Sequence, residues 1–164
     1  MMLSRKRWMA VVIALIVAAD WATKALIQQR IPFQTRRTIV EGWLSFQHNF
    51  NEGISWGLFS DAESPWRLPL LIALTLVGIG ATASIILQSR DRWIHAAGAL
   101  VLGGALGNLG DRVLDGGVTD FIYVHFFPYI FNVADIAISI GGVLLVARML
   151  LDARRGDPSA PTHA

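Results

Sequence analysis

Four long apolar stretches constrain the fold of this chain more than any other feature. They cover residues 8–27, 68–87, 93–111 and 128–147, and each approaches the length of about 20 residues that a helix needs to cross a bilayer. Of the 164 residues, 54% are hydrophobic and only 16% are charged, whereas soluble domains carry about 25% charged residues. We therefore predict an all-α polytopic membrane protein with four transmembrane helices.

Lysine and arginine are unevenly divided between the two sides of such a bundle. One side holds both chain ends and the connection between the second and third stretches, with Arg5, Lys6, Arg7, Arg90, Arg92, Arg148, Arg154 and Arg155. The other side holds Arg30, Arg36, Arg37 and Arg67. Because cytoplasmic loops carry the excess of basic residues, we expect both termini in the cytoplasm and segments 29–66 and 113–127 on the outer side.

The first apolar stretch has an alternative interpretation. Basic residues 5–7, followed by an apolar run that ends in the small residues 17–19, are also typical of a cleavable signal peptide. Apolar residues continue beyond Asp20 as far as Ile27. This continuation favours a membrane span.

The predicted spans and loops form one domain over residues 1–155. Residues 156–164 contain two prolines and small polar residues, a composition that predicts a disordered tail. In the first outward segment, residues 38–48 partly alternate as strands do. Residues 54–59 are apolar and aromatic. We expect a small β-like platform and a short interfacial segment there.

Polar side chains inside the spans lie at one depth. At about 1.5 Å of rise per residue, Asp20, Asn108 and Asp135 lie about 18, 22 and 19 Å from the cytoplasmic face. In a hydrocarbon core of about 30 Å, these positions are in the outer half. Ionisable groups are costly in a bilayer and mark functional sites. Three spans therefore supply a polar layer, whereas the span at 68–87 contains no charge.

Spacing places these polar residues in pairs on common helix faces. Side chains three or four residues apart are neighbours on a helix. The pairs are Asp20 with Lys24, Asn108 with Arg112, and Asn132 with Asp135.

Asp120 is a further candidate, although it lies in a predicted outward loop. Two glycines precede it and a strand-like run surrounds it over residues 118–122, so the loop can fold back towards Asp135. Two carboxylates that approach closely share a proton. An aspartic protease uses such a pair to activate water and polarise a carbonyl. The pairing of Asp120 with Asp135 is a hypothesis at this point.

Each feature also has a structural interpretation. Asp20 with Lys24 fits a helix-end ion pair, and Asp111 with Arg112 fits a pair that reaches the interface. Asn132 fits a hydrogen bond between helices, and Asp120 alone fits a solvated loop acid. Asp135 favours function, because it lies within a span with no basic residue nearby in sequence.

The polar layer is also compatible with two other classes of membrane protein. A transporter needs polar groups along the whole crossing, but the inner half of each span is apolar. A non-enzymatic lipid- or peptide-binding subunit would not need two aspartates. The histidines at 48, 95 and 125 have no metal-ligand spacing, and no cofactor is predicted.

Five segments, in order, resemble the lipoprotein signal peptidases, also called signal peptidase II. They are DWATK at 20–24, NEGISWG at 51–57, GGALGNLGDR at 103–112, VTDF at 118–121 and FNVAD at 131–135. The resemblance covers nearly the whole chain.

The resemblance implies an aspartyl endopeptidase of the bacterial inner membrane. Such enzymes remove the signal peptide of a diacylglyceryl-modified prolipoprotein just before its lipidated cysteine, and globomycin inhibits them. By this resemblance Asp120 and Asp135 are the catalytic pair, and the site faces the periplasm. No metal or cofactor is implied, and a self-contained site favours a monomer. The residues that would shape the site or bind substrate are Asp20, Lys24, Asn51, Gly53, Asn108, Arg112 and Asn132.

Overall fold

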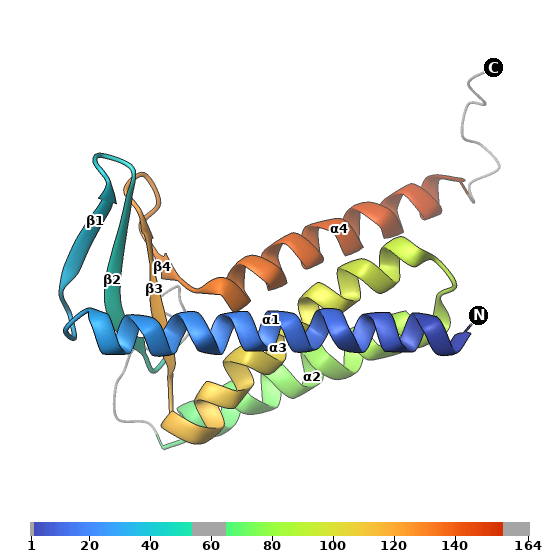
Figure 1. The fold of residues 1–164 in the computed structure, drawn as a ribbon. Coiled ribbons are helices and arrows are strands. Elements are labelled where there is room, and N and C mark those ends of the chain that lie inside the picture. Colours follow the sequence, from blue (N-terminus) through green and yellow to red (C-terminus); the bar gives the residue numbers. More distant parts are fainter. Residues whose placement is uncertain (1, 54–64, 156–164) are drawn as a thin grey trace.

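The structure, a computed structural model, describes residues 2–53 and 65–155. The predicted interfacial segment at 54–59 and the predicted tail at 156–164 lie outside these residues. Within the described ranges the chain forms four helices and four strands (Figure 1). The helices are α1 (Met2–Arg30), α2 (Arg67–Gln88), α3 (Arg92–Asp115) and α4 (Val133–Arg155).

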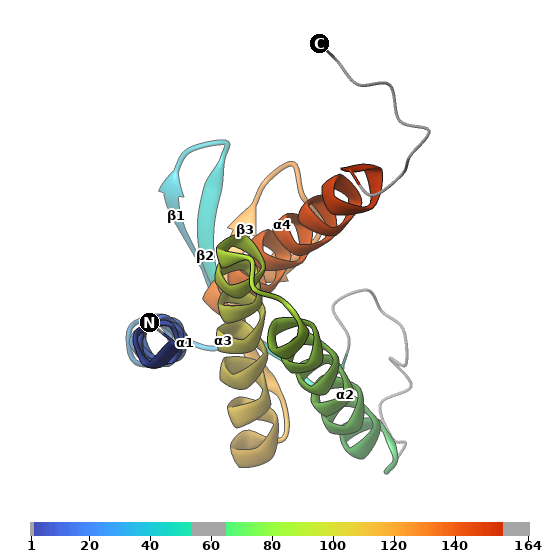
Figure 2. The same ribbon diagram turned by 90° about the vertical axis from the view of Figure 1, so that its right-hand side faces the viewer.

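Three apolar segments in the described part of the chain are long enough to cross a membrane. They are Arg7–Arg30 in α1, Arg67–Gln88 in α2 and Val133–Ala153 in α4. The fourth predicted span, at 93–111, does form helix α3, which is long enough to cross a membrane but is not among the helices apolar enough to do so. The reason lies in its position in the bundle. Figure 2 shows α3 between α1 on one side and α2 and α4 on the other, so much of its surface faces protein.

Glycine allows α3 to approach its neighbours closely. A Cβ atom at Gly104 would lie 2.3 Å from the carbonyl oxygen of Ala134 in α4, which is far inside van der Waals contact. A Cβ atom at Gly107 would lie 2.8 Å from a carboxylate oxygen of Asp20 in α1. The small residues that lower the hydropathy of α3 therefore let helix backbones pack together.

A four-stranded antiparallel sheet lies at one end of the helices, and the start of α1 and the end of α4 lie at the other (Figure 1). Its order is β1 (Arg36–Val40), β2 (Leu44–Asn51), β3 (Val118–Val124) and β4 (Ile130–Phe131). The sheet is thus larger than the predicted β-like platform, because the second outward segment supplies β3 and the start of the predicted fourth span supplies β4. The fold is mainly helical but not purely so.

Strand β3 is fixed against α1 by apolar and polar contacts. Phe121 packs with Ile27 and Ile31 in a buried cluster. The side-chain amide of Gln28 also donates to the hydroxyl of Thr119 at 2.8 Å. The first four residues of β3 are buried, so the strand that carries Asp120 is held at the junction between sheet and helices.

Helix α4 starts later than predicted. The span expected at 128–147 begins instead with β4, which pairs with β3, and the helix starts at Val133. Asp135 therefore lies in the first turn of α4 rather than deep within a helix. Strand pairing by two apolar residues, Ile130 and Phe131, accounts for the difference.

Candidate active site

Two carboxylates meet around one asparagine. The side-chain amide of Asn132 donates to Asp120 Oδ1 at 2.7 Å, and the backbone N–H of Asn132 donates to Asp135 Oδ2 at 3.2 Å. Asp120 is buried in β3, with 2% of its surface exposed, whereas Asp135 is partly exposed. The folded chain thus brings the two predicted acids to one place, and leaves one of them accessible.

The environment of Asp120 favours its protonated form. Burial and the nearby charge of Asp135 raise the pKa of Asp120 from 3.8 to about 7, against the opposing effect of hydrogen bonds from Asn51 and Asn132. Burial is the larger of these two causes of the raised pKa, because a low-dielectric environment disfavours the charged form of the carboxyl. Near neutral pH, Asp120 is therefore about half protonated.

Asn132 and Asp135 also form the N-terminal cap of α4. The N–H of Asp135 donates to Asn132 Oδ1 at 2.9 Å, while Asp135 Oδ2 accepts from the N–H of Asn132. This reciprocal pair is a capping box, formed by a cap residue and the third residue of the helix. The spacing of three in the sequence thus reflects a helix start rather than a shared face in mid-helix.

Lys24 is the buried cation of the site. Its ammonium group lies 2.5 Å from Asp20 Oδ2, 2.7 Å from Asp111 Oδ2 and 3.0 Å from Asn108 Oδ1. The other oxygen of Asp20 accepts the backbone N–H of Ala134 at 2.9 Å. A carboxylate at a helix N-terminus is favourable, so Asp20 connects α1 to the turn of α4 that carries Asp135.

Asn108 connects this cation to the aspartates. Its Oδ1 accepts from Lys24 and, at 3.1 Å, from Asn132 Nδ2. Its Nδ2 donates to Asp135 Oδ1 at 2.8 Å. A reversed amide would place its NH₂ group against two other donors. The neighbours therefore fix the orientation in which Asn108 donates to Asp135.

The remaining predicted residues lie at the edge of this network. Asn51 donates to Asp120 Oδ2 at 2.8 Å, and its Oδ1 accepts the backbone N–H of Gly53 at 2.9 Å. Arg112 donates to the carbonyl oxygen of Asn108 at 3.4 Å, and its charge interacts with those of both aspartates. All of the predicted site residues thus lie in one contiguous set.

The sequence matches the family described as signal peptidase (SPase) II over residues 12–151. The chain belongs to the signal peptidase II family. It is 35% identical over 155 residues to the lipoprotein signal peptidase of Solibacter usitatus, covering 91% of this chain and 94% of that protein. It is 37% identical over 150 residues to the lipoprotein signal peptidase of Aquifex aeolicus, covering 89% and 88% of the two chains.

The fold agrees with a solved structure of a bacterial membrane enzyme. The TM-score is 0.81 at 24% sequence identity, and 94% of each chain is covered. As a signal peptidase II, the chain is a membrane-bound hydrolase that removes signal peptides from prolipoproteins.

Asp111 was not predicted as a site residue in this signal peptidase II. One interpretation of the sequence was a pair with Arg112 at a helix end, whereas in the structure the carboxylate of Asp111 pairs with Lys24. Its spacing of three from Asn108 would have placed both on one face of α3. The hydrogen bond from the backbone N–H of Ala134 to Asp20 could not be predicted either, because nothing in the pattern of side chains indicates a main-chain donor.

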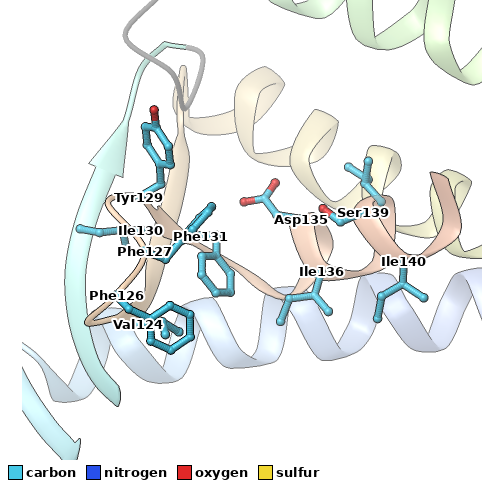
Figure 3. Close-up of a pocket in the computed structure, with 11 residues that line it drawn as sticks. Val124, Phe126, Phe127, Tyr129, Ile130, Phe131, Asp135, Ile136, Ser139 and Ile140 are labelled. Carbon is cyan, nitrogen blue, oxygen red and sulfur yellow. The ribbon is translucent and has the colours of Figure 1, made fainter. Parts of the chain in front are cut away.

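An apolar cavity of about 570 Å³ adjoins Asp135 (Figure 3). It lies between the segment around β4 and the first two turns of α4. Phe126, Phe127 and Phe131 form one side, and Ile136 and Ile140 form another. Among the described residues, no cluster of three or more His, Cys, Asp or Glu side chains has an arrangement suited to a metal ion.

Proposed function

We propose that the chain is an aspartyl endopeptidase that cuts diacylglyceryl-modified prolipoproteins just before the lipidated cysteine. Asp120 and Asp135 are the catalytic pair. The observation that carries this proposal is the position of Asn132, which donates one hydrogen bond to each carboxylate. The pair needs no metal or organic cofactor to activate water.

In the proposed reaction, Asp135 is the base and Asp120 is the acid. Asp135 is the more exposed of the two, so a water molecule can reach it. Asp135 takes a proton from that water, and the oxygen of the water adds to the scissile carbonyl carbon. Protonated Asp120 donates its proton to the carbonyl oxygen, which gives a neutral tetrahedral diol.

Collapse of the diol completes the cleavage. The proton held by Asp135 passes to the leaving nitrogen of the lipidated cysteine as the C–N bond breaks. One hydroxyl of the diol returns its proton to Asp120 and becomes the new carboxyl C=O. Asn108 and Asn132 keep both carboxylates in place during these transfers. The positive charge of Arg112 stabilises negative charge on the two aspartates.

We also propose the membrane arrangement. Helix α3 is the fourth span, since its 24 residues extend for about 36 Å at 1.5 Å per residue. The sheet then lies on the periplasmic side of the inner membrane and both termini lie in the cytoplasm. Residues 1–155 form one peptidase domain that works as a monomer in contact with membrane lipid. The scissile bond of a lipidated precursor lies near this outer interface.

Cleavage of a diacylglyceryl-modified precursor by the purified protein in detergent tests the function. We expect Asp120→Asn and Asp135→Asn each to lose more than about 10³-fold in kcat, as catalytic acids and bases acting as a unit do. Product is followed by gel shift, with globomycin as an inhibitor of the wild-type reaction. Asp115→Asn, at an exposed site on α3, is the matched control and should retain activity. Full activity in either dyad variant would rule out the proposed mechanism.

A further inference from the structure

The cavity beside Asp135 is not used by the proposed chemistry. Its wall includes the Asp135 carboxylate, and the rest is mostly aliphatic and aromatic (Figure 3). Ile136 and Ile140 follow Asp135 along α4, within the segment Val133–Ala153 that is apolar enough to cross a membrane. The cavity therefore extends from the reacting carboxylate along a candidate membrane span.

Protein hydrogen-bond donors already contact the two carboxylates. Asp135 accepts from Asn108 and from the N–H of Asn132. Asp120 accepts from Asn132 and Asn51 and is buried. The cavity is an open approach to Asp135, so substrate groups next to the cleaved bond lie at or in it.

The lining argues against a peptide backbone as the occupant. An extended backbone needs a hydrogen-bond partner at each residue, whereas the polar side chains of the lining are those of Asp135, Ser139 and Tyr129. Size argues against one apolar side chain. A cavity of about 150 Å³ holds a benzene ring, and the present one is about 570 Å³. It falls in the range of about 300–1,000 Å³ typical of whole small-molecule ligands.

We propose that this cavity is an acyl-chain subsite, which takes one fatty acyl chain of the lipidated cysteine. The proposal rests on the proposed function, because only a substrate lipidated beside the cleaved bond brings an acyl chain to Asp135. Exposed aromatic rings at the rim, Phe126 at 75% and Phe127 at 43% exposure, contact the glycerol end of the chain. Ile136 and Ile140 contact its methylene groups.

Acyl-chain length provides the test. Two precursors with the same peptide carry either dihexanoylglyceryl or dipalmitoylglyceryl, and kcat/KM is measured for each in detergent. Ile136→Trp and Ile140→Trp fill the cavity. We expect each to lower the ratio of kcat/KM for the dipalmitoyl over the dihexanoyl precursor by about tenfold, because the indole ring takes the place of methylene groups that only the longer chain buries there. Val143→Trp, on an exposed part of α4 outside the lining, should leave the ratio unchanged.

Phe126→Ala tests the subsite in the opposite direction. This variant removes an exposed ring of the rim rather than filling the cavity, so it keeps the test possible if a tryptophan variant does not fold. We expect kcat/KM to fall for both precursors, because both carry the glycerol end that this ring contacts, and an unchanged kcat/KM would count against the subsite. The proposal is overturned if no cavity variant changes the ratio, as would hold for a cavity filled by bulk membrane lipid. It is also overturned if the variants instead change the preference for apolar peptide residues before the cut. Failure of the wild-type protein to cleave either precursor would refute the proposed function itself.

Discussion

At the residue scale, the chemistry of Asp120 depends on which groups surround its carboxyl. Burial and Asp135 raise its pKa to about 7, and the amide of Asn51 acts in the lowering direction. Lys24, on α1, also lowers it. The proposed acid works only when protonated. Activity should therefore fall as pH rises through about 7, when Asp120 ionises beside Asp135 and no longer has a proton to donate.

This dependence gives a prediction for Asn51→Ala. The substitution removes a hydrogen bond that stabilises the charged carboxylate, so the pKa of Asp120 should rise further. We expect the midpoint of the alkaline limb in kcat/KM to move to higher pH by about one unit, the effect of one hydrogen bond to a charged group. Gln47→Ala, on the same strand and bonded to Arg36 instead, serves as control. An unchanged or lower midpoint in Asn51→Ala would contradict this assignment of the acid.

From the sequence, it was easier to predict which polar residues lie together than to predict their contacts. Polar side chains in apolar surroundings are conspicuous, so Asp20, Lys24 and Asn108 were readily predicted as one group. The contact of Asp120 with Asn132 was not, because it depends on the pairing of β3 with β4, where Ile122 lies opposite Phe131. Hydrophobic periodicity did not separate this short strand from the helix that follows it.

At the element scale, the position of α4 against α3 decides where Asp135 lies. Gly104 approaches the carbonyl of Ala134, one residue before Asp135. The hydrophobic pattern predicted both helices. It did not predict that α4 starts at Val133, because the apolar residues of β4 continue the pattern of the helix. The capping box of Asn132 and Asp135 is the local signal that marks the true start.

Gly104→Ala should therefore destabilise the protein. Its methyl group would meet backbone at 2.3 Å, which cannot move without shifting α4. We expect a loss of about 1–3 kcal/mol, seen as a lower Tm in detergent together with lower activity. Gly142→Ala, on α4 with open space around the added methyl group, is the matched control. It should be neutral or slightly stabilising. A Tm for Gly104→Ala as high as that of the control would show that the two helices can separate at little cost.

At the scale of the whole molecule, α3 distinguishes a four-span from a three-span arrangement. Hydropathy identifies the spans that face lipid, and α3 faces other helices on much of its surface. Four spans place the α2–α3 connection on the same side as both termini, with the sheet on the opposite side. If α3 did not cross, β3 and β4 would share a side with the α2–α3 connection, opposite β1 and β2, although all four strands belong to one sheet.

The absence of cysteine from the sequence makes this topology directly testable. Gln88→Cys introduces a thiol at the exposed end of α2, and Asp115→Cys introduces one at the exposed end of α3, so that α3 lies between the two positions. With a membrane-impermeant maleimide applied to spheroplasts, we expect labelling at position 115 and none at position 88 until the membrane is permeabilised. Equal labelling of both positions in intact spheroplasts would contradict the four-span arrangement.

The hydrogen-bond network of the dyad has a consequence for how the enzyme can be inactivated. All four carboxylate oxygens of Asp120 and Asp135 receive N–H groups. An asparagine at either position has the right shape but the wrong polarity on one side, since its NH₂ group must face another donor. No single exchange of carboxylate for amide is therefore silent, and the neighbouring amides must turn over or move apart to accept it. An inactive enzyme with an undisturbed site requires a change made outside this ring of donors.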